Sequence, residues 1–171
     1  MHGTEMVHNG PALPAPPAPP TLPNGSTAAK LDGGRLKLPP PYLKYLEGFS
    51  DKTVFVTTID EATVRVYPKC KWPQAANWLH STNIEQDVAE RLWTRVTYYG
   101  ADCVPDDQGR IQLPLILRQD LKLDKVTVYL CPQPSGDRFD LVPQEIMDRD
   151  VELARAHKAA DVSLAKKLRM P

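Results

Sequence analysis

The sequence predicts a mainly β fold with an α-helical insert, an α+β protein in which two copies of one unit close into a small barrel. The first observation is a phrase that occurs twice: LDGGRLKLP at residues 31–39 and DDQGRIQLP at residues 106–114. The second is the spacing after each phrase, since Arg35 and Arg110 are each followed by a proline 33 residues later. The chain therefore contains an internal repeat with a period of 75 residues.

Composition sets the broad class of the protein. The chain has 171 residues, of which 42% are hydrophobic, enough for one cored domain or two small ones. Its 21 Lys and Arg residues balance 21 Asp and Glu residues, so the overall charge indicates neither nucleic acid nor membrane. No apolar run approaches the ~18 residues that span a bilayer, and the N-terminus lacks the pattern of a secretory signal. We therefore expect no membrane partner.

Three cysteines, Cys70, Cys103 and Cys131, lie far apart in the sequence and form no CxxC pair. We expect neither a structural zinc site nor a disulfide framework, and the thiols are interpreted as small, partly buried hydrophobic groups. This usage is typical of a reducing cytoplasm.

The first 29 residues predict a disordered, proline-rich arm. The stretch 11–23 reads PALPAPPAPPTLP, and Glu5 is the only charged residue of the arm. Proline removes backbone donors and favours polyproline II, so this segment has little to fold around. Its PxxP spacing is also that of a ligand for a proline-binding module, but a flexible tail is the favoured interpretation.

The two repeats span residues 30–68 and 101–143, and each predicts a strand, a short helix and two further strands. The alternation in RLKLP and RIQLP is typical of a half-buried strand. Its inward-facing positions are Leu36, Leu38, Ile111 and Leu113. A proline then ends each strand and opens a helical turn.

The second half of each repeat predicts a β-hairpin. The predicted pairs are Thr53–Ile59 with Thr63–Tyr67 and Lys125–Leu130 with Arg138–Val142. Three short strands do not form a stable core alone. Two copies are therefore expected to interleave their strands into a barrel, which also removes exposed edges.

A helical insert, residues 69–100, separates the repeats. Its first helix is predicted to start at Trp72 and Pro73, and its second to run from Ile84 to Tyr99, with Asn83 as N-cap, Gln86 in capping-box position and Gly100 after the end. Tryptophans 72, 78 and 93 favour a core or subunit interface over a ligand-stacking set.

The C-terminal segment, residues 144–171, is rich in Ala, Glu, Lys and Arg. It predicts a charged, exposed helix from Gln144 to Arg169.

The repeated phrases carry a resemblance to a known family. LDGGRL at 31–36, DDQGRI at 106–111 and GRIQLPLILRQDLKL at 109–123 resemble the signatures of the MraZ family of bacterial transcriptional regulators, over about residues 28–150. The resemblance implies a double-split β-barrel of two SpoVT/AbrB-type repeats, assembled as a ring-shaped homo-oligomer. It also implies autorepression by binding to double-stranded DNA at short direct repeats upstream of the division and cell-wall gene cluster, and hence a cytoplasmic, nucleoid-associated protein.

The first repeat departs from the family pattern in two ways. Asp106 and Arg110 are separated by three residues as in the family, whereas only the two glycines 33 and 34 separate Asp32 from Arg35. Paired glycines suit such a tight loop because glycine accepts positive φ. The first repeat also has PPPYL where family members often carry a basic residue after the proline.

The signature has a chemistry of its own. An arginine presented at the start of a strand can contact guanine bidentately or grip phosphate, and the aspartate can hold the turn or the arginine. The alternative is an Asp–Arg pair that only stabilises its turn. Residues 30–44 carry a net charge of +3, whereas residues 105–119 carry none, which favours the first repeat as the DNA face. The predicted DNA-binding residues are Arg35, Lys30, Lys37, Asp32 and Arg110.

Two other classes of function compete with a DNA-binding regulator. A protein-interaction or scaffold ring that does not bind DNA is the alternative, favoured by the neutral overall charge and the proline-rich arm. An enzyme is not expected, because no histidine, nucleophile or metal cluster accompanies the Asp–Arg pairs and no Gly-rich phosphate loop is present. We accordingly predict no catalytic residue, metal, cofactor or small-molecule substrate.

Overall fold

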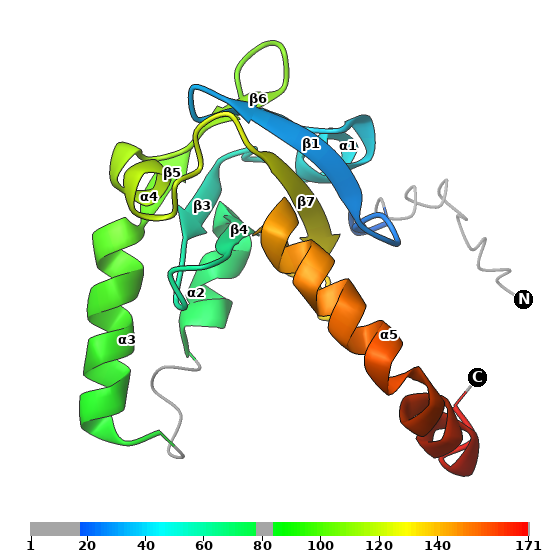
Figure 1. Cartoon of the computed structure of the whole chain (residues 1–171). Coiled ribbons are helices and arrows are strands. Elements are labelled where there is room, and N and C mark those ends of the chain that lie inside the picture. The colour runs from blue at the N-terminus through cyan, green and yellow to red at the C-terminus, as the bar shows by residue number, and fades with distance from the viewer. Residues whose placement is uncertain (1–17, 78–83, 171) are drawn as a thin grey trace, which may run out of the picture.

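The computed structural model describes residues 18–77 and 84–170. Eight antiparallel strands form one barrel-like sheet in the order β5-β3-β4-β8-β7-β1-β2-β6, from which α3 and α5 extend (Figure 1). The strands are β1 (Thr27–Asp32), β2 (Arg35–Lys37), β3 (Val54–Thr57), β4 (Val64–Pro68), β5 (Ala101–Cys103), β6 (Arg110–Gln112), β7 (Thr127–Pro132) and β8 (Phe139–Pro143). The helices are α1 (Pro40–Glu47), α2 (Trp72–Ala76), α3 (Gln86–Tyr99), α4 (Leu115–Asp120) and α5 (Gln144–Lys167), with a 3-10 turn at Lys69–Lys71.

The predicted interleaving of the two repeats is confirmed. Strand β1 of the first repeat pairs with β7 of the second, β5 of the second pairs with β3 of the first, and the pairs β2–β6 and β4–β8 join like strands across the repeats. The strand register also follows the 75-residue period. Ala28 pairs with Tyr129, and their counterparts in the other repeat, Cys103 and Val54, pair with each other. In the described chain no backbone ladder joins β5 to β6, so the barrel is nearly rather than fully closed.

Each repeat contains one strand that the sequence pattern did not predict. Strands β1 and β5 precede the glycine–arginine loops and lack the regular apolar alternation that marks a half-buried strand. The prediction of a disordered arm over residues 1–29 is therefore wrong for the last part of that segment. Residues 27–29 belong to β1, and Leu22 packs against the core. The part of the arm at residues 1–17 lies outside the described residues.

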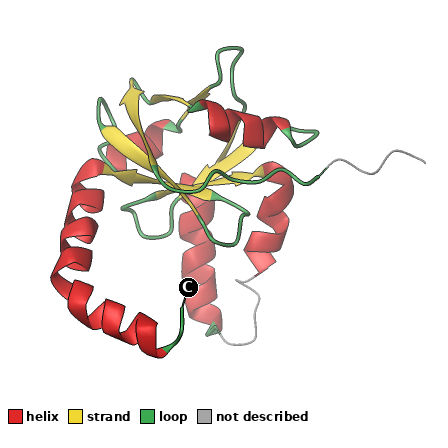
Figure 2. Ribbon diagram, turned by 90° about the vertical axis from the view of Figure 1, so that its right-hand side faces the viewer, coloured by secondary structure: helices red, strands yellow, loops and turns green. Residues whose placement is uncertain are grey.

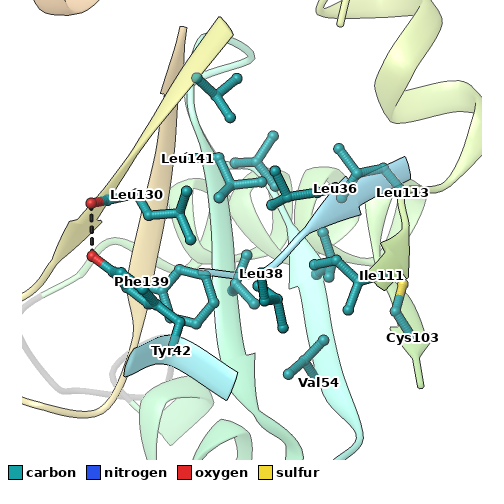
Figure 3. Close-up of a cluster of buried hydrophobic side chains, with 14 of the residues drawn as sticks. Leu36, Leu38, Tyr42, Val54, Cys103, Ile111, Leu113, Leu130, Phe139 and Leu141 are labelled. Carbon is teal, nitrogen blue, oxygen red and sulfur yellow. Dashed lines mark hydrogen bonds between the residues drawn. The ribbon is translucent and has the colours of Figure 1, made fainter. Parts of the chain in front are cut away.

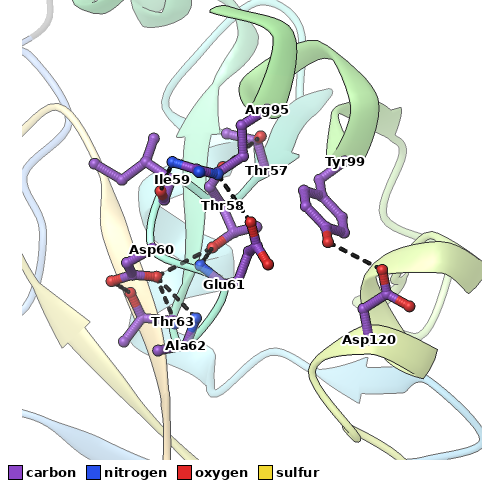
Figure 4. A network of polar contacts seen from close by, with 10 residues as sticks. All are labelled: Thr57, Thr58, Ile59, Asp60, Glu61, Ala62, Thr63, Arg95, Tyr99 and Asp120. Atoms are coloured by element: carbon purple, nitrogen blue, oxygen red, sulfur yellow. Dashed lines mark hydrogen bonds and ion pairs between the residues drawn. The ribbon is translucent and has the colours of Figure 1, made fainter. Parts of the chain in front are cut away.

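Strand β3 ends two residues earlier than predicted because a side chain organises the turn after it. The carboxylate of Asp60 accepts hydrogen bonds from the backbone N–H groups of Ala62 and Thr63 and from the hydroxyl of Thr58 (Figure 4). A short polar side chain that bonds the backbone two or three residues on is the usual device of such a turn.

The core lies inside the barrel and contains the four inward positions that the repeated phrase predicts (Figure 3). The buried phenol of Tyr42 is satisfied there, since its hydroxyl donates to the backbone oxygen of Leu130 at 2.7 Å while its ring packs edge-on against Phe139. Burial raises the pKa of Tyr42 to about 12. The polar group therefore stays neutral and costs the core little.

The insert helix α3 starts two residues later than predicted, at Gln86, with Glu85 in the N-cap position and no side-chain cap. Asn83 and Trp78 lie outside the described residues. Gly100 follows the helix as predicted, but its φ is −75°, which any residue can adopt. The position requires a small residue instead, because a Cβ there would lie 2.6 Å from the Phe55 ring.

The two described tryptophans pack on the barrel and on each other. Trp72 stacks on Phe55 with ring centroids 4.3 Å apart and lies edge-on to Tyr67, and Trp93, which is 43% exposed, stacks outside it. This arrangement agrees with a packing role for Trp72.

Helix α5 contacts the barrel through β7 and β8 at its start and then extends away from the strands in both views (Figures 1 and 2). Its side chains are almost all exposed, as the composition of the segment predicts. Among the described residues, every helix is too short or too polar to traverse a bilayer.

Candidate nucleic-acid interface

The short ladder of β2 and β6 is one of the four that join the two repeats, and we call it the seam. Leu36 lies opposite Ile111, and both are fully buried. Because side chains alternate along a strand, their neighbours face outward. The outer face of the seam therefore carries two cross-strand pairs, Arg35–Gln112 and Lys37–Arg110.

An open hollow of about 1000 Å³ lies over this seam, and all five predicted DNA-binding residues line it. The structure thus brings together residues from both repeats that are up to 80 positions apart in the sequence. Its charged lining comprises the cations Lys30, Arg35, Lys37, Arg110 and Arg118 and the carboxylates of Asp32 and Asp102, a net charge of +3. The hollow is therefore a basic surface on a chain of zero net charge.

The first loop is a two-residue hairpin turn. Gly33 and Gly34 have φ of +56° and +73°, the left-handed values that a two-residue turn requires and that glycine adopts without strain. Asp32 and Arg35 pair across this turn through their backbones. Within the described residues no ion pair joins their side chains; instead the Arg35 Nε donates to Gln112 Oε1 at 3.2 Å.

The second loop is built around its aspartate. Asp106 Oδ1 accepts the backbone N–H groups of Gln108 and Arg110, and Oδ2 accepts the Arg110 Nε at 2.7 Å. The backbone and side-chain bonds from Arg110 hold the pKa of the Asp106 carboxyl below its ordinary value of 3.8. Of the two copies, the second therefore forms the Asp–Arg side-chain pair, with the Asp106 carboxylate against the Arg110 guanidinium.

The loop carboxylate predicts a pH dependence of stability. A group whose pKa is depressed by folding stabilises the protein above its unfolded pKa, and that contribution is lost as the pH falls through the folded value. Asp106→Asn is therefore expected to melt at a lower temperature than the wild type at pH 7, with the gap shrinking as the pH falls below about 4. Thermal melts between pH 3 and pH 7 measure this gap. Asp107→Asn is the matched control, and a gap that stays constant with pH would show that the carboxylate charge is not what holds the loop.

Gln112 and Arg118 also line the hollow but are not among the predicted DNA-binding residues. The Arg118 Nη1 donates to the backbone oxygen of Gly33 at 2.7 Å, and the Gln112 Nε2 approaches the same oxygen at 3.3 Å. Arg118 also covers Gly34 so closely that a Cβ there would overlap the Arg118 Cδ. The repeat itself could have singled out Arg118, because its counterpart in the first repeat is Leu43, an apolar side chain in place of a charged one.

Two interleaved repeats that nearly close one barrel, each with a glycine-containing turn that leads into an arginine at the seam, define a mainly β, α+β protein built by internal duplication. No family model matches the chain. It is 30% identical over 146 residues to the protein of Nitrosococcus oceani named transcriptional regulator MraZ, a match that covers 84% of this chain and 95% of the relative. The chain therefore belongs to the MraZ family.

Other relatives carry the same name. The Desulforamulus reducens protein is 36% identical over 98 residues, covering 57% of this chain and 66% of the relative. The Acidobacterium capsulatum protein is 30% identical over 90 residues, covering 53% of this chain and 62% of the relative, so these two matches span less than two thirds of the relatives' lengths. All are named as transcriptional regulators and none as an enzyme. In the part of the chain that the structure describes, no group of three His, Cys, Asp or Glu side chains is placed to hold a metal ion.

Proposed function

We propose that the protein is a sequence-specific transcriptional regulator that binds double-stranded DNA through the β1–β2 hairpin and the hollow beside it. The observation that carries the proposal is the position of Arg35, which lies on a basic surface with its two terminal guanidinium nitrogens free of acceptors among the described residues. An arginine in this state can donate two parallel hydrogen bonds to guanine O6 and N7.

The other predicted residues take roles that follow from their surroundings. Lys30 and Lys37 flank Arg35 on the exposed side of β1 and β2, where a flexible ammonium suits phosphate. Asp32 is exposed at the mouth of the same turn, where a carboxylate can accept from the exocyclic amine of cytosine. Arg110 is held by Asp106 and is assigned to the architecture of the second loop and to a weaker phosphate contact.

We further propose that the protein acts as a ring-shaped homo-oligomer that represses its own operon by binding direct repeats upstream of it, within the division and cell-wall gene cluster, and that it is nucleoid-associated. The resemblance of both signatures to the family supports this. The charge of the hollow also supports an oligomer, because a net charge of +3 on one chain makes a weak DNA site. Several copies that bind one duplex together can raise the affinity by a factor on the order of 10²–10⁴.

The proposal is tested by the salt dependence of DNA binding. We expect the full chain to bind a duplex of the region upstream of its own gene, with an affinity that falls steeply between about 50 and 200 mM salt. Lys37→Ala is expected to lower the slope of log affinity against log salt by about 1 for each engaged subunit, because one phosphate contact is lost. Fluorescence anisotropy titrations at several salt concentrations measure both quantities.

Lys158→Ala, which removes an exposed lysine from α5, is the matched control and should leave the slope unchanged. Binding that is absent, or that prefers no sequence, would overturn the regulator and favour the scaffold ring instead.

A further inference from the structure

We infer that Gln112 and Arg118 of the second repeat position Arg35 of the first, and so determine the base specificity of the hairpin. This inference rests on the proposed function. Neither residue belongs to the hairpin, and both lie more than 70 positions away in the sequence. Each is a positioning residue that acts through Arg35 and its turn.

Gln112 is fixed at both ends of its amide. Its Oε1 accepts the Arg35 Nε at 3.2 Å, and its Nε2 donates to the backbone oxygen of Gly33 at 3.3 Å. A bond at Nε orients the guanidinium plane and leaves the two terminal nitrogens as the exposed edge, which is the edge that meets guanine.

The chemical nature of Gln112 distinguishes the two arginines. Because an amide is neutral, Arg35 keeps its full charge, whereas the carboxylate of Asp106 offsets the charge of Arg110. Gln112 therefore gives Arg35 a defined direction without weakening its attraction to DNA.

Arg118 holds the tip of the hairpin. Its Nη1 donates to the Gly33 oxygen at 2.7 Å, its side chain is only 17% exposed, and it lies over Gly34. The turn carbonyl thus receives a charge-assisted hydrogen bond from the other repeat, a strong kind of bond that restrains the backbone immediately before Arg35.

Comparison of the repeats shows that packing alone does not require an arginine at position 118. Its counterpart Leu43 covers Gly109 in the same way, with its Cδ2 2.8 Å from where a Cβ would stand. The backbone contacts are also reciprocal, since Leu38 N–H donates to Gly109 and Leu113 N–H donates to Gly34, both at 2.9 Å. The packing on the glycine and the reciprocal backbone bonds are common to both repeats and build the barrel. The hydrogen bond from a guanidinium of the other repeat is made to the first hairpin alone of the two loops.

The helix that carries Arg118 is itself tied down. The hydroxyl of Tyr99, at the end of α3, donates to Asp120 Oδ2 at 2.9 Å, two residues from Arg118 on α4 (Figure 4). This hydrogen bond is the main reason that the pKa of Tyr99 is raised to about 12. The position of Arg118 is therefore determined by the insert helix as well as by its own repeat.

The test compares Gln112→Ala and Arg118→Leu with the wild type on two duplexes, the region upstream of the gene and a shuffled sequence of equal length and composition. We expect Gln112→Ala to lose about tenfold or more of its affinity for the upstream duplex while binding the shuffled duplex as the wild type does, with an unchanged salt slope. Arg118→Leu removes one cation of the hollow and should weaken binding to both duplexes, but by about tenfold or more further on the upstream duplex. Arg118→Lys, which keeps a donor for the turn carbonyl, should recover most of the loss. Gln74→Ala and Arg155→Leu, both exposed and remote from the hollow, are the matched controls.

The ratio of the two affinities separates positioning from a merely structural role. Equal losses on both duplexes, together with a lower melting temperature, would overturn the inference, as would variants that discriminate as well as the wild type. A wild-type protein that binds both duplexes equally would instead overturn the proposed function, and the positioning role would fall with it.

Discussion

Arg35→Ala is expected to abolish the preference of the protein for its upstream DNA while leaving the barrel folded. A good bidentate contact to guanine contributes about 1–3 kcal/mol of discrimination, and the loss recurs at every subunit that engages the duplex. The side chain is exposed and its one described partner is Gln112, so its removal leaves no buried group unsatisfied. Competition titrations of specific against shuffled duplex, with thermal melts of both proteins, measure the two effects.

Arg110→Ala is the matched control, since it removes the same side chain from the equivalent position of the other repeat. Because Arg110 is bonded to Asp106 within its loop, we expect this variant to lose stability and to keep most of its sequence preference. Equal discrimination by the Arg35 variant and the wild type would mean that Arg35 is a turn residue, and the reader would have to be sought elsewhere in the hollow.

Leu36→Ala is expected to give the largest loss of stability, about 2–5 kcal/mol in the free energy of unfolding. Leu36 is fully buried where the two repeats meet, so truncation removes apolar contacts and leaves a cavity at the seam. Chemical denaturation followed by fluorescence measures the change. Because strands of both repeats are interleaved in one sheet, we expect one cooperative transition rather than two.

Leu153→Ala is the control for the same chemical change, at a side chain on α5 that is 60% exposed. It should alter the stability by less than about 0.5 kcal/mol. A similarly small effect of Leu36→Ala on the free energy of unfolding would contradict the prediction. It would show that the side chains around the β2–β6 ladder relax to fill the cavity.

Most of the fold could be predicted because it repeats. One short stretch of alternating apolar residues does not identify a strand by itself. The same alternation at residues 35–39 and 110–114, with equal spacing to the next hairpin, makes the strand assignment in each repeat support that in the other. Interleaving then follows from the size of the unit, which is too small to bury its own core. Strands β1 and β5 were missed because partners from the other repeat stabilise them, and no local pattern records that pairing.

The candidate site was predicted in part, for a related reason. Charge and the signature led to five predicted residues, all of which line the hollow, since charge and signature are properties of neighbouring positions. The Asp–Arg hypothesis fitted both copies equally from the sequence, yet only Asp106 and Arg110 form the pair. Gln112 and Arg118 could not be assigned to the first hairpin, because their contacts span 77 and 85 positions and depend on how the repeats interlock.

The unequal arginines give the molecule a polarity. In a dimer with true two-fold symmetry both halves read alike, and the matching DNA is palindromic. Here the approximate two-fold axis that relates β2 to β6 is broken, because the Arg35 guanidinium donates to the neutral amide of Gln112 and the Arg110 guanidinium donates to the carboxylate of Asp106. In the proposed homo-oligomer, copies joined by one repeated heterologous contact would then all face the same way along a duplex. This polarity suits tandem sites of a single orientation better than mirror-related half-sites.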